Sequence, residues 1–594
     1  MPKQRSLDVQ VRKLLKTGIR HQPAGRRGPA GESGILPAAP RAAPAHHRLG
    51  CLDLEAGEHQ KSRQLLGEAH ARNPDDPDTL NCLAESCLGQ GELEQALGYY
   101  RRLVELCPLS AKAHAQLALT EERVGNLRAA ADSYRRALAL EPGSPQAHCQ
   151  LAIVLRQLDA LPEALRLSEH AVALDPARFE TYNTLGIVLA DMKNLVAATE
   201  AFQRSFALKP DSALTAVDLG YFFVKCGDIR GAAESYRWAI ELDPHLYVAY
   251  LRLGTALTQL GDRPGAWKCY QRAQALCPSS SEVITYMGLL HLSEGNFRLG
   301  WGEYEYRESV RRARRRFRQP QWKGEALEGA RIFLHADQGL GDALQCVRYV
   351  PLVAARGGQV VLGVQTRLHR LLARTEGARQ VTSEEETPPE FRWHCPLLSL
   401  PLAFATDLNT IPSKIPYVEP DPAHVERWEE RLRGNSLRIG LAWGGNPNYP
   451  HELWRSIPLE LLAPLTHLEG TTFYSLQLGA PARQVKQLGP RVHLIDLQDE
   501  QKDFADTAAI VAHLDLVISI DTSVAHLAGS MGKAVWILLN NSPDWRWMLE
   551  REDTPWYPTA RLFRQSTFGN WQEVVARVER ELRDLVARTA ATRI

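Results

Sequence analysis

Small and apolar positions in the first half of the chain recur with one fixed period. Seven prolines mark this period, because each follows the one before by 34 residues: Pro74, Pro108, Pro142, Pro176, Pro210, Pro244 and Pro278. A small residue lies 24 positions before each proline: Gly50, Ala84, Ala118, Ala152, Gly186, Gly220 and Gly254. An alanine lies 12 positions before the last six. Small side chains let paired helices approach closely, and proline, which has no N–H, ends the second helix of each pair.

A period of 34 residues is typical of the tetratricopeptide repeat (TPR), and the chain resembles that family. We expect seven full repeats from about residue 43 to 280 and an atypical eighth repeat, residues 281–307, that caps the stack, so that the solenoid spans residues 43–314. Glycines punctuate the turn inside five repeats: Gly91, Gly125, Gly227, Gly261 and Gly295. Such a solenoid forms a concave groove that commonly holds a peptide or partner protein, and the alternative is a rigid spacer or oligomerisation arm.

Composition limits the remaining possibilities. Residues 1–42 are rich in Pro, Gly, Ala and Arg, which predicts a flexible basic arm. With 44% apolar and 23% charged residues and a net charge of +1, the chain reads as an ordinary globular protein and not as a general polyanion binder. It has neither an apolar run of about 18 residues nor the apolar core of a signal peptide, so we expect no membrane span and a cytoplasmic location.

The cysteines and an arginine-rich segment are two further candidate binding sites. The ten cysteines include no C-x-x-C pair, so the sequence predicts neither a metal site nor a disulfide framework, and most of the cysteines are expected in the core. Six arginines lie between residues 311 and 318. They could grip nucleic acid, but Glu303, Glu305 and Glu308 precede them, which favours one solvated helix face and no specific nucleic-acid partner.

From residue 330 onward, short apolar runs alternate with helical stretches. The runs "RIFLHA" and "QVVLGVQ" flank a helical segment, and the pattern restarts after a proline-rich join with "LRIGLAW", "TTFYSLQL", "RVHLIDL", "LDLVISI" and "AVWILLN". This order is that of parallel sheets. We expect an α-helical solenoid followed by two Rossmann-like, doubly wound α/β halves, residues 315–420 and 421–594, with ligands bound at the strand ends.

Several blocks of this half resemble a known enzyme family. "DQGLGDALQ", "RIGLAWGGNPN", "RSIPL" and "DTSVAHLAGSMG" occur in the order found in family-nine glycosyltransferases, which are similar to the ADP-heptose:lipopolysaccharide heptosyltransferases. The resemblance implies the B-type glycosyltransferase fold and metal-independent, inverting transfer of a sugar from a nucleotide donor, with no metal or other cofactor. The residues 315–420 would then form the acceptor side, and residues 421–594 the donor side.

The resemblance also assigns roles to single residues. Asp342 would be the general base, in a loop whose Gly339, Gly341 and Gln345 face the acceptor; the glycines would make room for acceptor and sugar. Taken alone, Asp342 is better explained as a helix-start residue, and its place in the family-like block is what favours catalysis. Asp521, Thr522, Ser523 and His526 would form the donor site, because hydroxyls and N–H groups at a helix start can hold a pyrophosphate. For Asp521 and His526 the alternatives are an N-cap and a helix histidine.

The loop after "RIGLAW" supplies the remaining donor candidates. Gly444 gives a permissive turn, Arg455 and Ser456 of "RSIPL" offer a permanent cation and a hydroxyl, and Gln477 could contact the nucleoside. Heptosyltransferases have a lysine and an acidic residue at the places of Arg455 and Gln477. Trp545 and Trp547 could stack against a base or sugar ring of the donor, or pack in the core.

The sequence therefore leads to a glycosyltransferase that moves a heptose-like sugar or another hexose onto a protein or glycan, with repeats that recruit the acceptor. The alternative is a non-catalytic TPR scaffold with a degenerate nucleotide-binding domain. Nucleotide-sugar binding with turnover that depends on Asp342 would distinguish the two.

Overall fold

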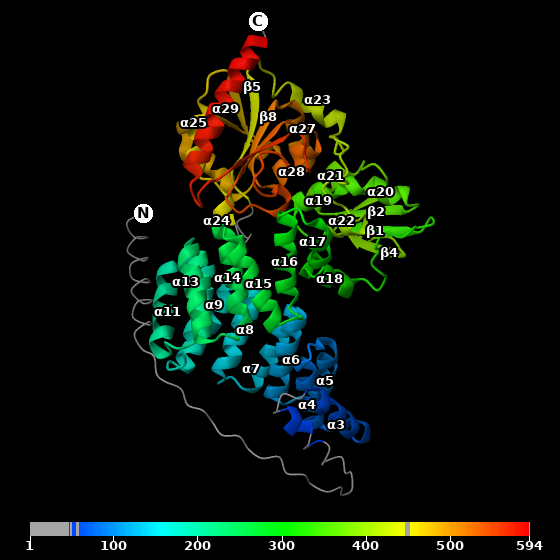
Figure 1. The fold of residues 1–594 in the computed structure, drawn as a ribbon, viewed down its shortest axis with the longest axis vertical. Helices are drawn as coiled ribbons and strands as arrows, with labels where there is room; N and C mark the ends of the chain where they lie inside the picture. The colour runs from blue at the N-terminus through cyan, green and yellow to red at the C-terminus, as the bar shows by residue number, and fades with distance from the viewer. Residues whose placement is uncertain (1–46, 48–49, 55–58, 446–451, 593–594) are drawn as a thin grey trace. The chain divides into compact units, whose positions relative to one another are not determined.

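The computed structural model describes residue 47, residues 50–54, residues 59–445 and residues 452–592 (Figure 1). The predicted arm, residues 1–42, lies outside the described residues. The chain divides into two compact units, Met1–Leu253 and Gly254–Ile594. The first contains most of the repeats. The second contains the last helix pairs together with the α/β region.

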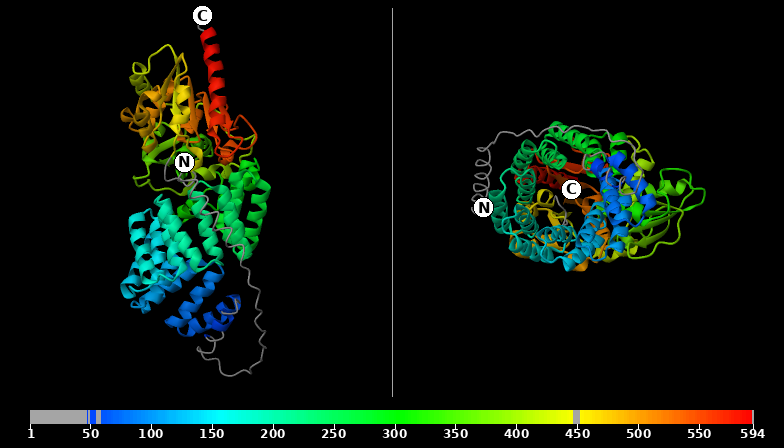
Figure 2. Two further views of the ribbon diagram at one scale, coloured as in Figure 1. Left: turned by 90° about the vertical axis from the view of Figure 1, so that its left-hand side faces the viewer. Right: turned by 90° about the horizontal axis from the view of Figure 1, so that it is seen from below.

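Antiparallel helix pairs make up the repeats, as the 34-residue period predicts (Figure 2). The helices of the first unit are α3 (His59–Arg72), α4 (Pro77–Gly89), α5 (Leu93–Leu106), α6 (Ala111–Val124), α7 (Leu127–Leu140), α8 (Pro145–Gln157), α9 (Leu161–Leu174), α10 (Phe179–Asp191), α11 (Leu195–Leu208), α12 (Ala213–Lys225) and α13 (Ile229–Leu242). Helix α14 (Tyr247–Leu260) spans the boundary, and α15 (Arg263–Leu276), α16 (Ser281–Ser293), α17 (Phe297–Tyr304) and α18 (Glu308–Arg316) follow.

The turn inside each repeat passes through the left-handed backbone region. Residues with positive φ recur every 34 positions and include the five glycines expected there. The other two turns carry Asp159 and Lys193 instead, each with φ of 62°. An L-residue pays about 1 kcal/mol or more to adopt this conformation, so these two turns carry strain that the glycine turns avoid.

The recurring small residues face aromatic rings of the partner helix. A methyl group added to Gly220 would lie 2.3 Å from the Tyr236 ring, and one added to Gly186 would lie 2.9 Å from Phe202. The close approach predicted from the small-residue pattern is therefore present, and a ring fills the space that each glycine leaves. Serines two positions after Pro108, Pro142, Pro210 and Pro278 cap the next helix through their hydroxyls.

Two parallel sheets form the core of the α/β region. The first has the order β3-β2-β1-β4, with β1 (Arg331–His335), β2 (Gln359–Val364), β3 (Ala378–Ser383) and β4 (Trp393–Pro396). The second has the order β10-β9-β8-β5-β6-β7, with β5 (Leu437–Ala442), β6 (Thr471–Ser475), β7 (Leu494–Asp496), β8 (Leu516–Ile520), β9 (Val535–Leu539) and β10 (Ala560–Arg564). The second order is that of a complete Rossmann sheet, and the first repeats its beginning. The predicted doubly wound halves are confirmed.

Helices and short 3₁₀ turns connect the strands. In the first half these are α19 (Leu340–Cys346), η1 (Val347–Tyr349), α20 (Val350–Ala355), α21 (Thr366–Leu372), η2 (Leu397–Ser399) and α22 (Leu400–Ala403). In the second they are α23 (Pro422–Glu429), α24 (Glu452–Arg455), α25 (Leu459–Thr466), η3 (Ala480–Ala482), α26 (Arg483–Leu488), η4 (Gly489–Arg491), η5 (Gln498–Glu500), α27 (Phe504–His513), α28 (Ser523–Ser530), η6 (Trp545–Trp547) and α29 (Trp571–Thr592).

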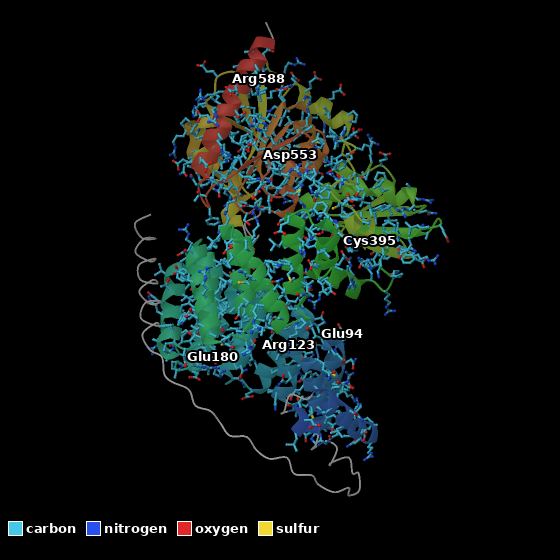
Figure 3. The ribbon with its side chains drawn as sticks, in the orientation of Figure 1. Glu94, Arg123, Glu180, Cys395, Asp553 and Arg588 are labelled. Atoms are coloured by element: carbon cyan, nitrogen blue, oxygen red, sulfur yellow. The ribbon has the colours of Figure 1, made fainter. Side chains whose placement is uncertain are left out.

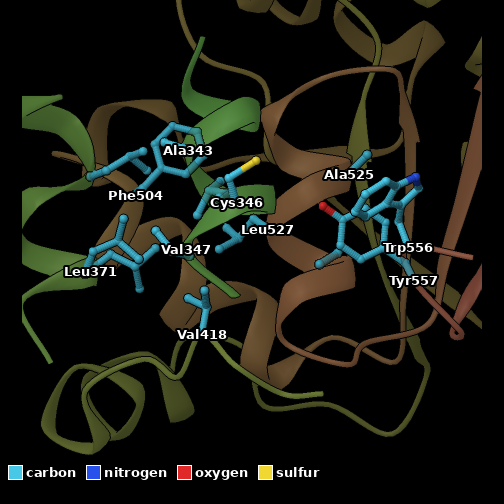
Figure 4. Packing of buried hydrophobic residues seen from close by; sticks show 14 of the residues in the cluster. Ala343, Cys346, Val347, Leu371, Val418, Phe504, Ala525, Leu527, Trp556 and Tyr557 are labelled. Carbon is cyan, nitrogen blue, oxygen red and sulfur yellow. The ribbon is translucent and has the colours of Figure 1, made fainter. Parts of the chain in front are cut away.

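The two halves share one apolar core. Helix α19 packs against α28, where Ala343 and Cys346 lie close to Ala525 and Leu527 (Figure 4). Polar contacts at the same junction come from Arg370, whose guanidinium lies 2.7 Å from both Asp503 and Asp506. A continuous core fixes how the loops of the two sheets face one another.

The atypical last helix pair continues into this core. Phe297 and Trp301 are buried with Trp545 and Trp556, and the Trp301 indole N–H donates to the Thr406 carbonyl at 2.9 Å. A terminal repeat usually has a polar outer face. Here that face is apolar because it packs on the α/β region instead of on water.

The arginine-rich segment forms helix α18. Glu308 pairs with Arg311 and Arg312 at 3.3 and 3.6 Å, as expected for a charged surface helix. The other two glutamates have different partners, since Glu303 bonds His291 and Glu305 bonds Arg307. Arg307 is buried and also pairs with Asp337 at 3.0 Å, which anchors α18 to the loop after β1.

The cysteines depart from the expected core positions. Only four of the ten are buried: Cys87, Cys149, Cys346 and Cys395, the last of which lies in β4 (Figure 3). Three of the others, Cys107, Cys226 and Cys277, sit at helix C-termini, where side chains reach solvent. Among the described residues, no helix combines the length and apolar character that a bilayer crossing requires.

Candidate functional site

The loops at the carboxyl ends of the strands line one pocket of about 1380 Å³ in the second unit. In a Rossmann sheet, ligands bind where the strand order reverses, which here is between β5 and β8 and, in the shorter sheet, between β1 and β4. The pocket is lined by loops that follow β1, β5, β6, β8 and β9. The geometry therefore places a cavity at the position where such folds hold ligands.

Most of the residues selected from the sequence lie together in this pocket. Its lining includes Gly339, Gly341, Asp342, Gly444, Arg455, Gln477, Asp521, Thr522, Ser523 and His526. Ser456 and Gln345 do not line it. The pocket thus joins candidates that are up to 187 positions apart in the sequence, from Gly339 to His526.

Asp342 pairs with an arginine that the sequence reasoning missed. One carboxylate oxygen accepts a hydrogen bond from Arg546, which lies in η6, and the other accepts from the Gly339 N–H at 2.6 Å. Burial raises the pKa of the Asp342 carboxyl, and the Arg546 guanidinium opposes that shift. Asp342 therefore caps helix α19, as its helix-start interpretation predicted, while its second oxygen reaches across to the donor half.

Arg546 is shared among several acceptors. Its Nη1 donates to Asp544 at 2.8 Å, its Nε donates to Gln345, and its guanidinium lies 4.3 Å from the centre of the Trp545 ring. Only 5% of Arg546 is exposed. A buried guanidinium needs such acceptors, because an unpaired buried charge costs several kcal/mol.

Gln345 has a different position from the one expected. The family resemblance implies a place in the acceptor-side loop, but Gln345 lies inside α19 and is fully buried. Because it is one helical turn after Asp342, both side chains point to the same face, and Arg546 bonds both. Gln345 thus orients Arg546 and does not face the pocket.

Gly341 makes room for a protein side chain. A methyl group added there would lie 2.6 Å from Cδ2 of His526, so the space expected for acceptor and sugar is taken by this imidazole. At Gly339 the nearest atom to an added methyl would be an Asp342 oxygen at 3.1 Å. The two halves of the α/β region therefore meet directly between the loop after β1 and helix α28.

His526 is a neutral, buried group. Burial lowers the pKa of its imidazole well below the usual value, and Arg546, Arg348 and Arg455 act in the same direction. Its Nδ1 lies 2.8 Å from the Tyr557 hydroxyl, and its Nε2 lies 3.9 Å from Asp521. In the neutral form His526 can offer one hydrogen bond to a ligand but no charge.

Asp521 and Arg455 form the floor near helix α28. The Arg455 Nη1 donates to the Asp521 carbonyl oxygen at 3.1 Å. Burial raises the pKa of the Asp521 carboxyl to about 6, and the nearby Asp544 adds to the shift. Thr522, and not Asp521, occupies the N-cap position of α28, and its hydroxyl lies 3.0 Å from Ser519 Oγ. The first residues of α28 line the pocket, and the start of the helix has no side-chain cap.

Gln477 and Ser456 brace the loop after β5. The Gln477 Oε1 accepts from the N–H groups of Trp443 and Gly444 at 3.0 and 2.7 Å, and its Nε2 donates to the Leu478 carbonyl. Ser456 Oγ accepts from the Gly445 N–H at 3.3 Å. Gln477 is a candidate contact to the nucleoside, but both ends of its side-chain amide already form hydrogen bonds that hold the turn. At Gly444 an added methyl would lie 2.6 Å from Pro481, which requires glycine there.

The last repeats supply another wall of the pocket. Trp545 lines it, whereas Trp547 is fully buried and packs on His526. Helices α14 and α16 also line the pocket, mostly with hydroxyl and amide side chains (Thr255, Thr258, Gln259, Ser281, Thr285, Tyr286 and Ser293) and in addition with Glu282, Leu289 and Leu290. The Asn541 amide donates to the Gln259 carbonyl at 3.1 Å, which ties this wall to the loop after β9. Periodicity alone gave no sign that the repeats reach the pocket.

Comparison with known proteins supports the repeat assignment. Models of the tetratricopeptide repeat match residues 47–111, 111–154 and 217–281, and no glycosyltransferase family model matches the chain. The protein is thus a TPR-repeat protein with a C-terminal α/β region of two parallel, Rossmann-like sheets. The glycosyltransferase resemblance rests on the motifs described above.

One curated relative covers about half of the chain. Protein FlbA of Caulobacter vibrioides is 30% identical over 342 residues, which cover 52% of this chain and 57% of FlbA, so the match spans little more than half of that protein. Among solved structures, a tetratricopeptide repeat protein from Parabacteroides merdae aligns with a TM-score of 0.37 at 13% identity, over 41% of this chain and 95% of its own. YrrB, a TPR protein with an unusual peptide-binding site, aligns with a TM-score of 0.20 at 19% identity, over 38% and 98%.

Proposed function

We propose that the protein is a metal-independent, inverting glycosyltransferase that uses a nucleotide-sugar donor. The observation that carries the proposal is the shared pocket, in which loops at the switch points of both sheets bring Asp342 together with Arg455, Asp521 and His526. An inverting transfer needs a carboxylate on the acceptor side and groups for a leaving diphosphate on the donor side. The first half of the α/β region supplies the carboxylate, Asp342, and the second half supplies Arg455 and the start of α28 for the diphosphate.

The proposed reaction uses the protein's own groups. The acceptor hydroxyl gives its proton to Asp342 as its oxygen bonds to the anomeric carbon, and the bond from that carbon to the diphosphate oxygen breaks. The N–H groups at the start of α28, with Thr522, Ser523 and Arg455, hold the departing diphosphate. Arg546 keeps Asp342 in place from the donor half.

The size and lining of the pocket support two substrates. Pockets for one small ligand measure about 300–1000 Å³, and this pocket exceeds that range at about 1380 Å³. The additional space borders α14 and α16, so we propose that the last repeats bind a protein or glycan acceptor through hydroxyl and amide groups. Heptose-like sugars and other hexoses remain the proposed donor classes, and the cytoplasm remains the proposed location.

A binding test should come first. Nucleoside diphosphates and nucleotide sugars of each base, tested by thermal shift on the full chain, should stabilise it, by about 2.7 kcal/mol at 100 times the dissociation constant. Arg455→Gln should weaken this stabilisation. No stabilisation by any member of the panel would overturn the proposal.

Turnover is tested separately. Sugar release or transfer from the stabilising donor should fall by at least 100-fold in Asp342→Asn while donor binding persists. Asp553→Asn is the matched control, because this carboxylate of the second half is exposed, pairs with Arg551 and lies outside the lining of the pocket (Figure 3). The rival function, a nucleotide-sensing scaffold, is favoured by the pairing of Asp342 with buried Arg546. Donor binding without turnover would support that rival.

A further inference from the structure

A second cluster of chemically active side chains lies where the first two repeats meet, within the first unit. His47, Cys51 and Cys82 place one ligand atom each within 4.8 Å of one another. Cys51 belongs to the helical residues 50–54, and Cys82 belongs to α4. Across the described part of the chain, no other group of three His, Cys, Asp or Glu side chains brings its ligand atoms this close. We propose that these three residues bind a borderline or soft transition-metal ion, with Zn²⁺ as the reference ion.

Hydrogen bonds fix which imidazole nitrogen faces the thiols. The Thr79 hydroxyl donates to an Asp76 carboxylate oxygen, so its own oxygen is left to accept from His47 Nδ1 at 3.0 Å. The Nδ1 therefore carries the proton, and Nε2 carries the lone pair, 3.6 Å from Cys51 Sγ. Metal-binding histidines are oriented in this way by an acceptor on the opposite nitrogen.

The start of the second repeat holds this arrangement in place. Asp76 is the N-cap of α4 and also accepts from the Thr79 N–H at 3.0 Å, and Thr79 is buried. The position of the imidazole thus depends on a helix cap and not on a loose surface contact. His47, Cys51 and Cys82 themselves are half-buried, so an ion can reach them from solvent.

The donor set suits zinc better than a hard cation. Two thiolates and one imidazole are ligands that Zn²⁺ prefers, and together they leave one of four tetrahedral positions for water. Binding would release the two thiol protons, and the two thiolates would balance the charge of a divalent ion. The Cys51 and Cys82 sulfur atoms are 2.9 Å apart, whereas two sulfurs on one tetrahedral zinc lie about 3.8 Å apart. Binding therefore requires the sulfurs to separate by about 1 Å, within the reach of a small side-chain rotation.

The test uses the full chain without a histidine tag, reduced and freed of metal by chelation. Titration with Co²⁺, which takes zinc sites and is coloured in them, should give a thiolate charge-transfer band that saturates at one ion per chain and disappears when Zn²⁺ is added. Cys51→Ser and Cys82→Ser should each abolish the band, and His47→Ala should weaken binding at least tenfold. Cys226→Ser is the matched control, because this half-buried cysteine lies outside the cluster, and it should leave the band unchanged.

Two results would overturn the proposal. One is a Co²⁺ band that is absent in the reduced wild type, or that persists in both cysteine variants when circular dichroism shows them folded. The other is a Cys51–Cys82 disulfide, found by mass mapping of protein purified without reductant, combined with no metal binding after reduction. The pair would then be a redox pair and not a metal site.

Discussion

Replacing Asp521 by asparagine should stabilise the second unit at neutral pH but not in acid. Burial, with Asp544 nearby, raises the pKa of this carboxyl to about 6 from an ordinary value of 3.8. In the unfolded chain Asp521 ionises near pH 4, whereas in the folded chain it holds its proton to higher pH. The folded state thus loses stability as pH rises from about 4 to above 6. A difference of about two pKa units corresponds to about 3 kcal/mol.

Tryptophan fluorescence is the appropriate assay, because 12 of the 13 tryptophans lie in residues 254–594. Urea unfolding followed in this way should show Asp521→Asn more stable than wild type by up to about 3 kcal/mol at pH 8, with the difference vanishing near pH 4. Asp499→Asn, at an 81% exposed carboxylate, should show no such difference. An equal gain at both pH values, or no gain at pH 8, would refute the reasoning.

Three further substitutions, the first with a matched control, test the packing of the repeats, the strain in one turn and the effect of a buried histidine. Gly220→Ala should destabilise the first unit by about 1–3 kcal/mol, because the added methyl group would lie 2.3 Å from the Tyr236 ring. Gly98→Ala is the control: no atom lies within 4 Å of its added methyl group, so this variant should be neutral or slightly stabilised. Circular dichroism melts measure both. Lys193→Gly should stabilise the first unit by about 0.5–1 kcal/mol in the same melts, because φ is 62° there, and an unchanged melt would contradict this. Burial lowers the pKa of the His335 imidazole to about 3, so the unfolded chain takes up a proton first as pH falls and the wild type loses stability. In His335→Phe the free energy of unfolding of the second unit should therefore fall less between pH 7 and pH 4.5. Unfolding followed by fluorescence measures this difference.

The repeats were predictable because each one is a local structure. Helix boundaries follow from prolines, small residues and turns that lie within 34 positions of one another, and no distant contact is needed to place them. The strand pattern was also predictable, but three of the ten strands found in the described residues were missed: β3, β4 and β10. All three are edge strands, and β3 alternates little while β4 has only four residues. Edge strands lack the continuous apolar run that burial on both faces imposes.

The candidate site was predictable only as far as topology fixes it. Loops at the carboxyl ends of parallel strands must converge, and this explains why Asp342 and Asp521 share a pocket. Arg546 could not be found in this way. It lies in a three-residue turn, 204 positions after Asp342, and no periodicity or spacing marks it. The buried charge of Asp342 demands a cation, but the sequence does not say which of many arginines supplies it.

The balance of charge in the pocket leads to a last prediction that links donor binding to pH. Asp342 and Asp544 are paired with Arg546, whereas burial and the neighbouring Asp544 raise the pKa of the Asp521 carboxyl to about 6. A diphosphate bound at the start of α28 would add negative charge beside it and raise that pKa further. Asp521→Asn should therefore bind nucleoside diphosphate more tightly than wild type at pH 8, by about tenfold for each 1.4 kcal/mol of relieved repulsion. The ratio between variant and wild type, measured by calorimetry, should shrink toward pH 6, and taking this ratio cancels the titration of the ligand itself. A ratio that stays constant from pH 8 to pH 6 would show that the diphosphate lies elsewhere than beside Asp521.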